Sequence, residues 1–79
     1  MSVAWHPEFS AYVRGDSEDV LLEVGAWMGA QRGDVEVEIE EGTLSLSAYL
    51  TPEQARAVAA ALNRSADRLD GGVAVEVER

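Results

Sequence analysis

The chain of 79 residues contains no cysteine, no lysine and a single histidine, His6. Without thiols it cannot form disulfides or thiolate metal centres, and one imidazole excludes a multi-histidine site within one chain. No apolar run approaches the roughly 20 residues that a membrane span requires, and the N-terminal segment lacks the basic and apolar regions of a signal peptide. We therefore expect a cytoplasmic protein without a cofactor.

Positive charge is also scarce, because six arginines face 15 acidic residues and the net charge at pH 7 is -9. Proteins that bind nucleic-acid phosphates or anionic lipid draw most of their attraction from positive charge. Direct binding to either partner is therefore not expected. In the simplest interpretation, the acidity keeps a small protein soluble.

The most regular segment of the chain spans residues 51–70 and predicts a long helix. Thr51 is a good N-cap, Pro52 suits the first helical position, and Gln54 completes a capping box. Gly71 is expected to end the helix. Apolar residues recur at spacings of three and four and form one stripe, made of Ala55, Val58, Ala59, Leu62, Ala66 and Leu69.

The rest of the chain predicts strands, because apolar and polar residues alternate in several short segments. These segments are residues 9–13, 20–28, 35–40, 43–50 and 73–78. Residues 3–5 could form a short edge strand that Pro7 stops, residues 29–34 read as a loop, and Glu41-Gly42 predicts a tight turn.

One helical stripe and several one-sided strands predict a single α+β domain over residues 1–79. We expect a two-layer sandwich, in which an antiparallel or mixed sheet of four to five strands carries the helix on one face. A right-handed crossover through the helix would place residues 73–78 parallel to residues 43–50.

Two large apolar residues, Leu21 and Trp27, interrupt the polar side of their strand. An apolar residue on the wet side of a sheet suggests that another molecule covers it. We therefore predict a homodimer and a partner-binding surface on the outer face of the sheet, with a further protein partner as a possibility. The predicted surface residues are Leu21, Trp27, Tyr49, Glu36, Glu38 and Glu40.

Other motifs have simpler explanations. Arg-Gly-Asp occurs at residues 14–16 and 32–34, where glycine and aspartate fit turns better than cell adhesion. The acidic clusters at residues 16–19 and 36–41 lack the spacing of a calcium loop, so we do not predict a metal site. His6 has no sequence neighbour that would make it a general base.

The run RGDVEVEIEEG followed by LTPEQARAVAAALNRSADRLD resembles short acidic proteins that are common in actinobacteria and their phages. The resemblance covers about Trp27 to Asp70. It implies acidic strands followed by a capped, alanine-rich helix, and it implies no activity or residue role.

These observations favour a small non-enzymatic accessory protein, encoded by a phage or mobile element, that acts through protein interaction and self-assembly. The alternative is an acidic inhibitor that imitates nucleic acid and binds a DNA-binding host protein. In that case glutamates on the strands would stand in for phosphates, namely Glu36, Glu38, Glu40, Glu76 and Glu78.

Overall fold

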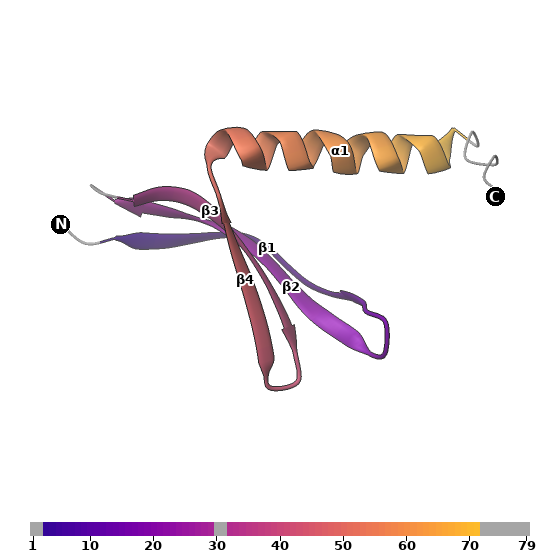
Figure 1. The fold of residues 1–79 in the computed structure, drawn as a ribbon, viewed down its shortest axis with the longest axis horizontal. Helices are drawn as coiled ribbons and strands as arrows, with labels where there is room; N and C mark the ends of the chain where they lie inside the picture. Colours follow the sequence, from indigo (N-terminus) through magenta and orange to yellow (C-terminus); the bar gives the residue numbers. More distant parts are fainter. Residues whose placement is uncertain (1–2, 30–31, 72–79) are drawn as a thin grey trace.

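A computed structural model of the chain describes residues 3–29 and 32–71. The elements are β1 (Ala4–Arg14), β2 (Asp19–Gly29), β3 (Arg32–Glu41), β4 (Leu44–Leu50) and α1 (Pro52–Asp70). The strands form one antiparallel sheet in the order β1-β2-β3-β4 (Figure 1). Helix α1 packs against β3 and β4, which confirms the predicted α+β two-layer fold.

The central strands agree with the sequence prediction except at one end. β3 begins at Arg32, inside the segment predicted as a loop, because Arg32 pairs with Gly29 across the hairpin. The turn after β3 is confirmed: Glu41 pairs with Leu44, and Gly42 takes a φ of 59°. Glycine reaches such an angle without steric cost. The strand predicted at residues 73–78, and with it the crossover, lies outside the described residues.

The prediction for the N-terminal segment was wrong, because β1 runs through Pro7 as one strand. Proline cannot donate to a ladder, but β1 is an edge strand with only one neighbour. The register with β2 shifts between Pro7 and Phe9, which marks a bulge at that point. A bulge at an edge absorbs the irregularity that proline introduces.

Helix α1 has the predicted start. The Thr51 hydroxyl accepts a bond from the Gln54 amide at 3.1 Å, and the Gln54 side chain accepts one from the Thr51 amide at 3.0 Å. Together these bonds satisfy two amides that would otherwise lack partners at the helix N-terminus. At the other end, the Gly71 amide donates to the Asp67 carbonyl at 2.8 Å. The predicted helix limits are therefore confirmed.

The strict alternation of the strands separates the sheet into two faces. We call the first the aliphatic face, and it carries Phe9, Ala11, Val13, Val20, Leu22, Val24, Ala26, Val35, Val37, Ile39, Leu46, Ala48 and Leu50. We call the second the acidic face, and it carries Trp5, Ser10, Tyr12, Leu21, Glu23, Trp27, Arg32, Asp34, Glu36, Glu38, Glu40, Ser45, Ser47 and Tyr49. Helix α1 lies over the aliphatic face.

The helix covers only one end of that face. In Figure 1 it begins at the end of β4 and runs across the top of the view, while the β1–β2 and β3–β4 turns lie at the opposite end of the sheet. Its first turns and the sheet form a small apolar cavity of about 140 Å³ that is open to solvent on one side. The cavity is lined by Val24, Val35, Val37, Leu50, Ala55, Val58, Ala59 and Leu62.

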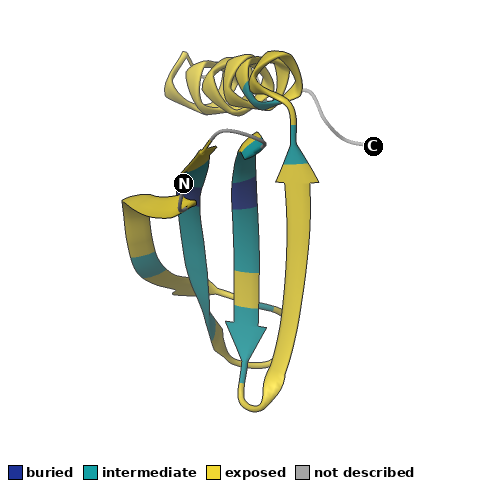
Figure 2. Cartoon of the chain, turned by 90° about the vertical axis from the view of Figure 1, so that its left-hand side faces the viewer, coloured by how far each residue is buried: buried dark blue, intermediate teal, exposed yellow. Residues whose placement is uncertain are grey.

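The described part of the chain has no buried apolar side chain. The buried residues in 3–29 and 32–71 are Gly25 and Glu36, and most of α1 and β4 is exposed (Figure 2). The radius of gyration is 15.6 Å, whereas a compact domain of this length has one of about 12 Å. The expectation that the helical stripe covers the sheet is therefore correct for one end of the sheet and wrong for the remainder.

Candidate interaction surfaces

Trp27 stands at the centre of an aromatic cluster on the acidic face. Its ring lies 5.1 Å from that of Trp5, centroid to centroid, with an angle of 44° between the planes. Its Nε1 donates to Glu36 Oε1 at 2.7 Å, and the guanidinium carbon of Arg32 lies 4.6 Å from its ring centroid. The indole is therefore half-buried by residues of its own chain.

Arg32 links this cluster to β4. Its guanidinium carbon lies 5.1 Å from the Tyr49 ring centroid, and its Nε donates to Asp34 Oδ1 at 3.0 Å. Stacking of arginine between two aromatic rings is worth about 0.5–1 kcal/mol per contact at an exposed site, and an exposed ion pair adds little more. Arg32 thus organises the surface around Trp27 and Tyr49, although Tyr49 itself stays exposed.

Gly25 makes the close packing of Trp5 possible. A Cβ atom built at Gly25 would collide with the six-membered ring of Trp5 and would lie 2.7 Å from the His6 carbonyl oxygen. Only a residue without a side chain lets Trp5 lie flat on β2 at this point. The signal in the sequence was a glycine inside an apolar strand, which often marks such an approach.

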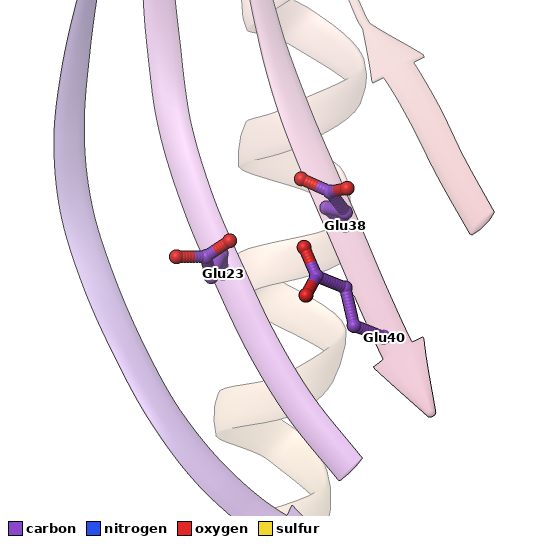
Figure 3. Close-up of side chains that lie close together, drawn as sticks. All are labelled: Glu23, Glu38 and Glu40. Atoms are coloured by element: carbon purple, nitrogen blue, oxygen red, sulfur yellow. The ribbon is translucent and has the colours of Figure 1, made fainter. Parts of the chain in front are cut away.

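An acidic cluster occupies the same face beyond Trp27. Carboxylate oxygens of Glu23, Glu38 and Glu40 lie within 4.8 Å of one another (Figure 3). Glu23 and Glu38 are directly paired across β2 and β3, while Ser45 donates to Glu38 at 2.7 Å. Partial desolvation, followed by the nearby charges of Glu38 and Glu23, raises the pKa of Glu40.

The six residues predicted for the outer surface do share one face, but they serve in different groups. Trp27 and Glu36 bond to each other, Tyr49 stacks on Arg32, and Glu38 and Glu40 belong to the acidic cluster. Leu21 is paired with Glu40 across β2 and β3, and it belongs neither to the aromatic cluster around Trp27 nor to the acidic cluster. Sequence reasoning did not assign Trp5 or Arg32 to this surface.

The aliphatic face is the larger apolar surface exposed by the chain. Leu44 is 70% exposed and Leu46 is 68% exposed, and Phe9 on β1 is half exposed. A shallow depression of about 210 Å³ lies at this end of the sheet, between Ile39 and Leu44. A sequence with alternating strands gives no sign that its apolar side is left uncovered.

The single histidine lies on the edge strand β1. His6 is aligned with Ala26 in the register of β1 and β2, and Ser10 on the same strand donates to Glu23. None of the helices in the described residues is long and apolar enough to cross a membrane. Comparison with protein families, curated proteins and solved structures gives no significant match.

Proposed function

We propose that this chain is a small non-enzymatic interaction protein that works by self-association. The observation that carries the proposal is the absence of any buried apolar side chain in residues 3–29 and 32–71. Burial of apolar surface is the main contribution that offsets the conformational entropy lost on folding. A single sheet with one partly attached helix gains too little of it alone.

Self-association supplies the missing burial. A partner that binds only the folded state stabilises that state by mass action. Closed symmetric dimers are the commonest homo-oligomers, so a homodimer is the simplest assembly that buries the exposed apolar surface of the sheet. In this proposal, folding and assembly of the chain are one coupled process.

The test is a pair of measurements on the full chain in solution. Sedimentation equilibrium at micromolar concentration should give the mass of a dimer, and the melting temperature followed by circular dichroism should rise with protein concentration. A monomer with a cooperative melt that is independent of concentration would contradict the proposal.

The acidic face supports a second candidate function, imitation of nucleic acid. Three carboxylates gathered within 4.8 Å of one another, on a chain of net charge -9, present dense negative charge to a cationic DNA-binding protein. Because Glu36 also bonds Trp27, the cleaner test replaces Glu23, Glu38 and Glu40 with glutamine.

This function predicts capture of a DNA-binding protein from host lysate at low salt, with steep loss at high salt. The triple glutamine variant should lose that protein, and Ala60→Asp on the far side of α1 should retain it. Salt-independent capture, or capture that survives the triple substitution, would contradict imitation of nucleic acid.

A further inference from the structure

Helix α1 uses only part of its apolar stripe within the chain. Ala55, Val58 and Ala59 line the cavity against the sheet, together with Leu62 at its edge. Leu62 is nevertheless 66% exposed, and Leu69, two turns further on, is 73% exposed. The same row of side chains that packs on the sheet therefore continues beyond it without a partner among the described residues.

The sheet has a matching uncovered area. Ile39, Leu44 and Leu46 are exposed on the aliphatic face, away from the end that α1 covers, and Phe9 is exposed on the edge strand β1. Both areas are aliphatic. Both continue the interface at which α1 packs against β3 and β4. One is a helical stripe and the other a sheet surface, which is the pairing that the two-layer architecture uses.

We propose that two copies of the chain pair through their aliphatic faces, so that the C-terminal half of each α1 packs on the uncovered sheet of its partner. This inference rests on the self-association proposed above and names its surface. Two-fold symmetry buries both areas at once, because the helix of each copy packs on the sheet of the other. Such an interface is closed and leaves no further stripe to recruit a third copy.

Charge favours a second copy over other occupants of this face. The glutamates of the acidic cluster point to the opposite side of the sheet (Figure 3), and Glu41 lies at the rim of the aliphatic face, paired with Leu44. Packed layers are about 10 Å apart, so the two acidic faces of a dimer are separated by more than the Debye length of about 8 Å at physiological salt. A cationic partner would be attracted to the acidic face instead.

The helical arginines are also compatible with this arrangement. At 100° per residue, Arg64 lies on the side of α1 opposite Leu62 and Leu69. The interface would therefore bury aliphatic side chains and leave the basic side of the helix in solvent. No charge needs to be removed from water to form it.

The available area is sufficient for a stable dimer. The chain exposes 6192 Å², whereas a folded monomer of 8.5 kDa exposes about 4,700 Å². The chain therefore exposes about 1,500 Å² more than a compact monomer of its mass. Burying half of it on each of two copies removes about 1,500 Å², which lies within the range of stable interfaces.

The first experiment compares dissociation constants of the full chain and three variants by sedimentation. Leu62→Asp and Leu46→Asp place a charge on the helix side and the sheet side of the interface. Each should weaken dimerisation by at least about 30-fold, the effect of losing a central apolar contact. Ala60→Asp adds the same charge to the far side of α1 and should change the constant by about twofold at most.

The second experiment reads out the geometry in a chain that still folds. Because the sequence has no cysteine, single cysteines introduced at Leu69 and Leu46 are unique. Differently tagged Leu69→Cys and Leu46→Cys chains, mixed and treated with a short bismaleimide, should give a cross-linked heterodimer. Tyr12→Cys, exposed on the acidic face, should not cross-link to Leu69→Cys.

The outcomes separate this inference from the function on which it rests. A chain that is monomeric at every concentration would overturn both. A dimer that keeps its affinity in Leu62→Asp and Leu46→Asp, and that cross-links through Tyr12→Cys, would leave self-association standing and overturn this surface. Weakened dimerisation in both variants together with the Leu69–Leu46 cross-link supports the proposal.

Discussion

On the acidic face of the sheet Trp27 contacts Trp5, Arg32 and Glu36, whereas on the aliphatic face Leu46 contacts mostly solvent. Around Trp27, the side of the sheet that alternation predicts to be solvent-exposed is packed by its own side chains. Around Leu46, the side that alternation predicts to be core is open to solvent. Alternation assigns residues to faces, but the elements available to cover a face decide whether it is buried.

The reason for the difference lies in the size of the covering groups. Large amphipathic side chains can cover a sheet from within, as the rings of Trp5 and Trp27 cover Gly25 and its surroundings. The aliphatic face carries shorter side chains and depends on α1, which crosses only its upper end. That face needs a second layer, which the proposed partner copy supplies.

The largest expected effect on the free energy of unfolding comes from a substitution at Val37, on the aliphatic face. Val37→Asp puts an unpaired charge against α1 and should cost several kcal/mol, comparable to the whole stability of a domain of this size. Its neighbour variant Glu38→Val, on the acidic face, should change stability by about 0.5 kcal/mol at most. Urea denaturation followed by circular dichroism measures both.

These two variants would contradict the comparison if the acidic face, and not the aliphatic face, proved necessary for the stability of the fold. Val37→Asp that unfolds at the urea concentration of the parent would mean that the aliphatic face is not part of the folded core. Glu38→Val that unfolds the chain would give the acidic face a structural role that its exposed carboxylates do not suggest.

The second effect concerns the packing of Trp5 on the acidic face. Gly25→Ala places a methyl group against Trp5 and the His6 carbonyl, and it should destabilise the fold by about 1–3 kcal/mol, the usual cost of overpacking. Tryptophan emission should shift to longer wavelength as the ring is displaced. Gly33→Ala, where the added atom meets nothing within 4 Å, is the matched control and should be neutral.

The third effect isolates the bond between Trp27 and Glu36. A double-mutant cycle with Trp27→Phe and Glu36→Gln should give a coupling free energy of about 1.5–3 kcal/mol, as expected for a hydrogen bond to a charged group. Trp5→Phe removes an indole for which no hydrogen bond is seen in the described residues, and its coupling to Glu36→Gln should be close to zero. Equal coupling for both tryptophans would show that ring packing, not the bond, holds this face together.

The sequence predicted the parts of this fold that depend on local chemistry. The helix limits follow from Thr51, Gln54 and Gly71, and the hairpin turn follows from Gly42, because each of these residues acts on its immediate neighbours. The course of β1 through Pro7 was missed, since edge position depends on the whole sheet.

The candidate surfaces were predicted less completely, because their contacts join residues far apart in the chain. Trp5 meets Trp27 only through the pairing of β1 with β2, and Glu23 meets Glu38 only through the pairing of β2 with β3. Strand register is needed to find either contact. The uncovered aliphatic face depends on where α1 crosses the sheet, which no periodicity reveals.

The smallest expected effect is the change of stability with pH that ionisation of Glu40 in the acidic cluster causes. Partial desolvation and the charges of Glu38 and Glu23 raise the pKa of Glu40 above its ordinary 4.5. The folded chain therefore holds this proton more tightly than the unfolded chain does. The stability it contributes is fully present below the ordinary pKa and is lost as the pH rises through the raised value.

Glu40→Gln removes the charge, and with it the loss of stability that ionisation of Glu40 causes. The variant should therefore melt slightly above the parent at pH 7, and the difference in melting temperature should shrink as the pH falls below 4.5. Thermal melts at several pH values measure it, with Glu18→Gln in the β1–β2 turn as the control for net charge. The same difference at every pH, or a parent that melts above Glu40→Gln at pH 7, would mean that the three carboxylates do not repel one another. Because added salt screens exposed charges, the difference at pH 7 should also narrow as ionic strength increases.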